Sequence, residues 1–273
     1  MILKYINHLN EEIDLTSPPY LLTESEAYNY SWEFDTVKPS SRKSKIKAFR
    51  RQSKTFSADL FIKSSNFNED MNTFFEVVEK DVLAEIPGKL VRENGEYLSC
   101  YIFEGRNESI HIRNGQCKKK LNIVSPHPFW IEEVSRDFFP KKKQESDNLD
   151  YPYNYDYDYA PSSGAQTWNI DHYAASEFQL TIFGPAVDPL VNINGHTYQV
   201  YDTLDSTDYI VVDSRDHTIK KHKTDGTQLN LYDMRAKESS VFELIPAGRL
   251  AFNWSGTFGF NLRLFLERSE PEW

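Results

Sequence analysis

Short strand-like runs separated by turn residues dominate the second half of this chain, and they constrain its fold more than any other feature. Apolar and polar residues alternate over runs such as EFQLTIFG, DYIVVDS, RLAFNW and FGFNLRLFLE. SSVFELIP (239–246) reads as a further strand. Asn194-Gly195 is a strong hairpin signal because both residues accept the positive φ angles of a two-residue turn, and Asp225-Gly226 marks a second turn. Short strands at even spacing predict a β-sandwich.

One segment of the first half has helical periodicity instead. In NEDMNTFFEVVEKDVLAEIPG the apolar residues recur every three or four positions, which predicts one buried helix face. The residues of that face are Met71, Phe74, Phe75, Val78 and Val82. Asn66 or Asn68 is placed to act as the N-cap, and Pro87-Gly88 ends the helix.

Strands surround this helix. TFSADLFIK (55–63) alternates cleanly and places Phe56, Ala58, Leu60 and Ile62 on one face. Further strands are expected at 96–105 and 109–124. The character changes at PHPFW (126–130), where two prolines flank His127 and impose an extended backbone.

The chain is therefore predicted to be mainly β and to form two domains. Its 273 residues are enough for both. The first, residues 1–130, is a β-sandwich with one α-helix. The second, residues 131–273, is a β-sandwich whose last strand can return to the first domain. No internal repeat is visible.

A tyrosine-rich segment, YPYNYDYDY, leads into the second domain. Strict alternation of aromatic and polar residues is typical of a two-faced strand, but Pro, Asn and Asp are poor strand residues and also fit an extended linker. Tyrosine offers a large contact area with a polar tip, which suits a seam between domains or subunits. We expect Trp130 and the five tyrosines to line an inter-domain seam; the tyrosines are Tyr151, Tyr153, Tyr155, Tyr157 and Tyr159.

The totals exclude several classes of protein. A net charge of −10 argues against specific nucleic-acid binding, which needs an excess of Lys and Arg. Two cysteines, Cys100 and Cys117, cannot form a disulfide framework, and we expect free thiols. The N-terminus lacks a signal-peptide core, and no apolar run is long enough to cross a bilayer, so we expect synthesis in a reducing cytoplasm and no membrane partner.

A search for catalytic or metal-binding patterns finds none of convincing spacing. No nucleophile elbow, phosphate-binding loop or dinucleotide fingerprint is present. Cys117 precedes three lysines that favour a thiolate, but the position fits a strand end equally well. Acid and histidine side chains that suggest a metal site lack ligand spacing; they are Asp171 with His172, and Asp213 with Asp216 and His217. We expect no enzyme activity, no cofactor and no metal.

The strongest local charge feature is RKSKIKAFRRQSK (42–54), which has seven bases and no acid. It is compatible with a solvated hairpin, with docking on an acidic protein surface, or with nucleic acid, although only Phe49 supplies an interleaved aromatic ring. We take the bases as a candidate subunit- or partner-docking site; they are Arg42, Lys43, Lys45, Lys47, Arg50, Arg51 and Lys54.

The order of several segments resembles one known family, the distal tail proteins of bacteriophages with long non-contractile tails. The helix NFNEDMNTFFEVVEKDV, its exit IPGKLV, the strand EYLSCYIFEG and the central PHPFW are similar to the first half of that family. The second half carries FGPAVDPLVNING, YIVVDSRDHTIKKHKTDG and FELIPAG in the family's order. The likeness covers most of the chain.

This resemblance implies a structural hub of the phage tail tip, or baseplate. The first domain would form a homohexameric ring between the tail tube protein and the tail-associated fibre or lysin protein. The second, galectin-like in fold, would serve as a platform for receptor-binding components. The protein would reside in the virion, and the family has no catalytic residues to carry over.

A carbohydrate-binding protein is the alternative reading. In it, the second β-sandwich recognises host cell-wall polysaccharide, with Trp168, Trp254 or Tyr201 as stacking platforms. Packing in the core is the simpler role for these aromatic residues. A small glycan hydrolase is a third reading, which the lack of a convergent polar cluster disfavours.

Overall fold

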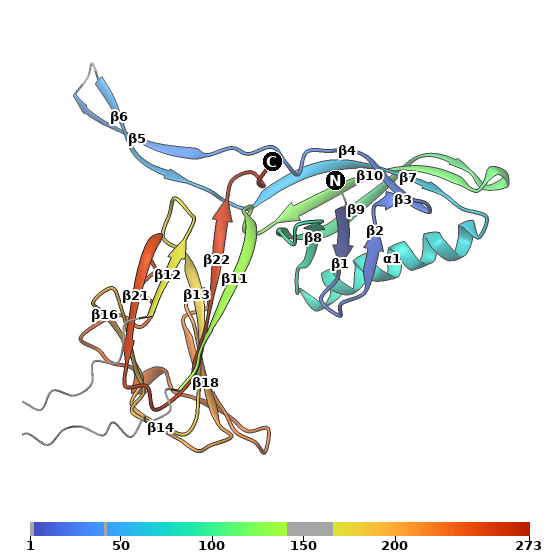
Figure 1. Ribbon diagram of the computed structural model, residues 1–273. Helices are drawn as coiled ribbons and strands as arrows, with labels where there is room; N and C mark the ends of the chain where they lie inside the picture. The colour runs from blue at the N-terminus through green and yellow to red at the C-terminus, as the bar shows by residue number, and fades with distance from the viewer. Residues whose placement is uncertain (1–2, 41–42, 141–165) are drawn as a thin grey trace, which may run out of the picture. The chain divides into compact units, whose positions relative to one another are not determined.

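A computed structural model describes residues 3–40, 43–140 and 166–273 (Figure 1). The chain divides into two compact units, Met1–Glu132 with Glu267–Trp273, and Glu133–Leu266. Strands β11 (Trp130–Phe138) and β22 (Phe260–Arg268) each begin in one unit and end in the other. The prediction of a mainly-β, two-domain chain with one α-helix is confirmed.

Antiparallel strands and one helix build the first unit. The strands pair in the order β3-β4-β7-β10-β9, and β9 also pairs with β8, which leads to β1 and β2. The bounds are β1 (Leu3–Ile6), β2 (Glu12–Asp14), β3 (Thr16–Ser17), β4 (Tyr20–Ser25), β7 (Lys54–Lys63), β8 (Gly88–Arg92), β9 (Tyr97–His111), the 3-10 turn η1 (Ile112–Asn114) and β10 (Gln116–Ser125). The predicted alternation in β7 is confirmed, because Phe56, Ala58, Leu60 and Ile62 are all buried.

Helix α1 (Phe67–Ala84) contributes to the same core. Asn66 occupies the N-cap position, and Glu85 ends the helix with a left-handed backbone before Pro87. Phe74 and Val78 are buried as predicted, but the prediction is wrong for Phe75 and Val82, which are 53% and 39% exposed. The core-facing stripe of a helix covers only part of its circumference, and the strands here leave these two side chains uncovered.

The second unit is a sandwich of two antiparallel sheets around one core. Its strands pair in the orders β20-β19-β18-β13-β22-β11 and β12-β21-β15-β16, with the short pair β14-β17 beside them. The bounds are β12 (Gln166–Ile170), β13 (Glu177–Phe183), β14 (Ala186–Val187), β15 (Leu190–Ile193), β16 (His196–Gln199), β17 (Thr203–Leu204), β18 (Tyr209–Asp213), β19 (Thr218–His222), β20 (Gln228–Asn230), η2 (Tyr232–Met234) and β21 (Gly248–Trp254).

Local turn chemistry in the second unit agrees with the sequence, but one strand does not form. Asn194 and Gly195 have φ angles of 49° and 89° and join β15 to β16, which confirms the predicted hairpin. The strand predicted at 239–246 is wrong. Val241 and Ile245 are buried there, yet the segment makes only an isolated bridge, between Ile245 and Ser176. Burial of these two side chains holds the segment in place without the continuous backbone hydrogen bonds of a strand.

Candidate functional site

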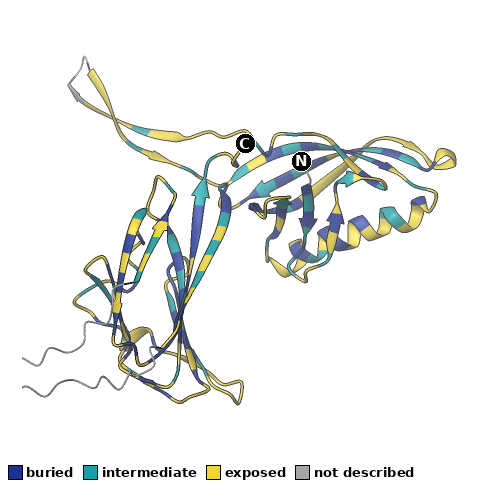
Figure 2. Ribbon diagram, in the orientation of Figure 1, coloured by how far each residue is buried: buried dark blue, intermediate teal, exposed yellow. Residues whose placement is uncertain are grey.

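The basic stretch of the sequence lies on a β-hairpin formed by β5 (Glu33–Ser40) and β6 (Lys43–Arg50). We call this hairpin the arm. Its two strands pair with each other and with no other described strand. Figure 2 shows that the arm is exposed along nearly its whole length. A two-stranded hairpin is marginally stable by itself, so an arm of this kind is expected to gain a partner.

One face of the arm is apolar. Phe34 pairs directly with Phe49, and Thr36 pairs with Ile46 after a bulge, so these residues share a face. The rings of Phe34 and Phe49 meet edge to face at 6.4 Å. Phe34, Phe49 and Ile46 are 59%, 59% and 55% exposed. Large apolar side chains gathered on one exposed face indicate an interaction surface.

The other face of the arm carries charge. Arg50 forms an ion pair with Asp35 at 2.7 Å, and Lys45 lies opposite Val37. Lys43, Lys45 and Lys47 are exposed on β6. Among the candidate docking residues, these lysines and Arg50 therefore share the arm, whereas Arg42 lies outside the described residues.

The remaining two bases of the stretch are held at the foot of the arm. The Arg51 guanidinium lies 4.4 Å from the centre of the Phe129 ring and 5.6 Å from the Trp32 ring. The Lys54 ammonium donates a hydrogen bond to the Asn29 carbonyl, and burial lowers the pKa of Lys54. Cation–π contacts of this kind fix an arginine in place, so these two bases anchor the arm.

Of the aromatic residues predicted to line an inter-domain seam, the structure describes only Trp130. Trp130 is buried in the core of the first unit, stacks on Tyr28 at 5.5 Å, and donates its indole N–H to the Ala27 carbonyl at 3.3 Å. The five tyrosines at 151–159 lie outside the described residues. The seam stays a prediction.

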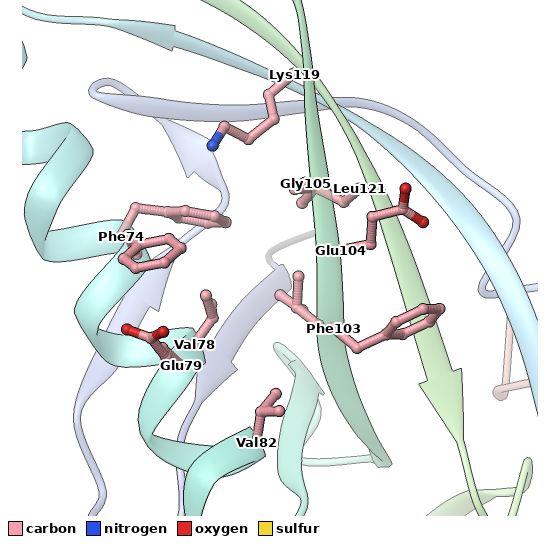
Figure 3. Close-up of a pocket in the computed structure, with 11 residues that line it drawn as sticks. Phe74, Val78, Glu79, Val82, Phe103, Glu104, Gly105, Lys119 and Leu121 are labelled. Atoms are coloured by element: carbon pink, nitrogen blue, oxygen red, sulfur yellow. The ribbon is translucent and has the colours of Figure 1, made fainter.

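A groove opens between helix α1 and strands β9 and β10, as Figure 3 shows. Its volume is about 220 Å³, and its walls include Phe75, Val82 and Phe103. Lys119 lines it from β10 with its stem against Gly105, and only 8% of this lysine is exposed. Glu79 brings acid to the groove from the helix, whereas the Glu104 carboxylate points away from the helix in Figure 3 and accepts a hydrogen bond from Asn122. The sequence signal for this groove was the width of the apolar face of the helix. The core covers Phe74 and Val78, whereas Phe75 and Val82 stay exposed and line the groove.

The candidate chemical sites do not assemble. Within the described residues, no group of three His, Cys, Asp or Glu side chains is placed to hold a metal ion. Asp213 is engaged by Arg215, with carboxylate–guanidinium distances of 3.0 and 3.3 Å. Burial raises the pKa of the Cys117 thiol despite the opposing charge of Lys119, which is the reverse of what a nucleophile requires.

The proposed sugar-stacking residues are largely committed to packing. Trp254 is 3% exposed and donates its indole N–H to the Phe258 carbonyl at 3.0 Å, so it is not available as a surface platform. Trp168 is half-buried against the core, and Tyr201 is exposed. In the part of the chain that the structure describes, no helix has the length and hydrophobicity to cross a membrane.

The fold is similar to that of phage hub and baseplate proteins of known structure. No family model and no curated protein matches the sequence. Among solved structures, the SPP1 Dit protein, described as a paradigm of the hub adsorption apparatus in phages that infect Gram-positive bacteria, matches with a TM-score of 0.62 and 11% identity. The match covers 98% of this chain and 100% of that one.

Two structures of the phage P2 baseplate in its activated conformation also match. The one with Ca has a TM-score of 0.66 at 13% identity and covers 99% of this chain and 100% of that chain. The one with Sr has the same TM-score and identity and covers 99% of each chain. The resemblance to distal tail proteins is thus confirmed in fold over essentially the whole chain.

Proposed function

We propose that this protein is a structural hub subunit of a phage tail tip. The observation that carries the proposal is the end-to-end agreement of fold with the SPP1 hub protein and the P2 baseplate chains, at TM-scores of 0.62 and 0.66. The agreement extends over both units of the chain. It therefore favours a likeness of the whole two-unit protein over a likeness of one common β-sandwich domain. Fold alone does not carry a function, so the site must support it independently.

The arm supplies that independent support. Closed rings require heterologous contacts, in which one surface of a subunit meets a different surface of the next. The arm is an exposed, amphipathic and basic element on a chain whose net charge is −10. Such unlike surfaces suit head-to-tail assembly, and we propose a homohexameric ring.

The remaining parts of the proposal follow from the hub role. The ring would lie between the tail tube protein and the tail-associated fibre or lysin protein, and the second unit would offer a platform for receptor-binding components. The protein would act in the virion after synthesis in the cytoplasm of the bacterial host. The role is structural and requires no catalysis, cofactor or metal.

Light scattering on a size-exclusion column tests the ring. We expect a mass near six subunits, or a mass that climbs toward it with concentration. Replacing Lys43, Lys45 and Lys47 by Glu should shift this climb to higher concentration, because charge complementarity governs association. A matched variant with three exposed lysines of the second unit replaced by Glu should leave it unchanged; these are Lys220, Lys223 and Lys237. A wild-type chain that stays monomeric at every concentration would refute self-assembly into a ring.

A further inference from the structure

Two surfaces of the first unit are uncovered. One is the apolar face of the arm that carries Phe34, Ile46 and Phe49, and the other is the groove between α1, β9 and β10, which has both apolar and charged side chains. We propose that the arm of one subunit docks into the groove of the next. This inference rests on the proposed ring and names the contact that would close it.

The arm presents compact anchors. Phe34 and Phe49 sit opposite each other in the hairpin register, and Ile46 extends their face toward the tip. Aromatic side chains bury a large area at low entropic cost and act as anchors in protein interfaces. Arg51 at the foot of the arm, held against Phe129 and Trp32, gives these anchors a fixed base.

The groove is shaped for side chains of a protein partner. Its volume of about 220 Å³ is below the roughly 300–1,000 Å³ that is typical of small-molecule sites. Phe75, which lines the groove from the helix, is 53% exposed. The labelled side chains in Figure 3 show helix and strand residues on opposite sides of this opening. One or two phenyl rings from the arm would cover Phe75.

Charge favours the same pairing. Helix α1 contains five acids and one base, Lys80, which is bound to Glu11 at 2.6 Å. Glu79 lines the groove and is exposed, and Glu76 is exposed on the same helix. The arm offers three exposed lysines, Lys43, Lys45 and Lys47. Lys119 also lines the groove but is only 8% exposed, so the exposed charge that the helix brings to the groove is acidic.

The occupant is a second copy rather than the chain's own arm. Had the arm folded back on its own groove, Phe49 and Phe75 would be covered, yet they are 59% and 53% exposed. Each subunit therefore has one donor surface and one different acceptor surface. This is the heterologous arrangement that closes into a ring or continues as a filament.

Disulfide trapping tests the contact in the full-length protein. Chains carrying Phe49→Cys are mixed with chains carrying Phe75→Cys and mildly oxidised; a mixture of Phe49→Cys and Val187→Cys chains is the control. All three substituted positions are exposed, so the new cysteines leave the core intact. The native Cys100 and Cys117 are buried and should not compete for cross-linking. We expect heterodimer formation at least about tenfold faster than in the control, because docked residues are held at high effective concentration.

Charge exchange gives a second readout. Reversal of the three arm lysines to Glu, or of Glu76 and Glu79 to Lys, should each weaken association by about tenfold, and combining both sets in one chain should restore it. The docking contact would be refuted if assemblies form but the two cysteine positions do not cross-link faster than the control, and the combined charge reversal weakens association by the sum of the two separate effects. The proposed hub function would not be affected by that result. Chains that never associate would overturn both.

Discussion

The stability of the first unit should depend on Asp81, an acid on the buried face of α1. Its side chain is 0% exposed. It accepts a hydrogen bond from the Tyr5 hydroxyl at 2.5 Å and one from the His8 backbone N–H at 2.9 Å, and the His8 Nδ1 lies at 2.6 Å. Asp81 thus links the helix to the strand and loop that open the chain. Replacing it by Ala would leave these polar groups without their acceptor.

The size of the effect follows from these contacts. Each buried donor that loses its partner costs about 1–3 kcal/mol. Because Asp81 accepts two such hydrogen bonds and also contacts the His8 ring, we expect Asp81→Ala to cost about 3–5 kcal/mol. For a domain of this size, that loss corresponds to a fall in Tm of about 6–20 °C. Asp81→Asn keeps the volume and one acceptor oxygen and should cost less.

Calorimetry combined with circular dichroism measures this effect. The transition of the first unit should move, while that of the second unit serves as an internal reference. Glu76→Gln, on the exposed side of the same helix, is the matched control and should stay within about 0.5 kcal/mol of wild type. If Asp81→Ala shifts the transition no more than this control, the buried network does not stabilise the fold and the reasoning fails.

Three further predictions concern other parts of the chain. Gly88→Ala should destabilise the first unit by about 1–3 kcal/mol in denaturant titrations, because a Cβ there would come within 2.3 Å of a buried carboxylate oxygen and 2.6 Å of a buried tyrosine hydroxyl. Burial opposes ionisation of Asp213, yet the hydrogen bonds and charge of Arg215 lower its pKa below the ordinary 3.8. Its contribution is therefore present above that pH and lost as the pH falls through the folded-state pKa, so Asp213→Asn should be less stable than wild type at neutral pH and approach it in acid. Burial raises the pKa of both Cys100 and Cys117, so native protein should react with Ellman's reagent only as fast as it unfolds; rapid labelling would contradict this.

Local patterns predicted the elements that depend only on nearby residues. The alternation in 55–63 places its apolar side chains on one side of any strand, and β7 buries them. Asn194-Gly195 forms its turn because these two residues adopt positive φ angles at little cost, whatever surrounds them. The helix and its end before Pro87 follow from backbone chemistry in the same way.

The candidate site was predicted only in part. The basic stretch identified the arm, since a dense run of bases has few uses inside a core. It did not separate the exposed lysines from Arg51, which packs on Phe129, because that contact joins segments far apart in the chain. The groove was missed for the same reason: it forms only when helix α1 comes together with strands β9 and β10.

Sequence by itself thus determined the class of fold, the single α-helix, the turns and the basic arm, all of which arise from periodicity and short-range backbone preference. Only the tertiary structure decided which apolar residues are covered, so that Phe75 is exposed while Trp254 is buried. It also placed the last residues, where the Glu272 carbonyl accepts a hydrogen bond from Arg92 at 2.6 Å within the first unit. Burial depends on what distant segments bring to a surface, and a local pattern cannot specify that.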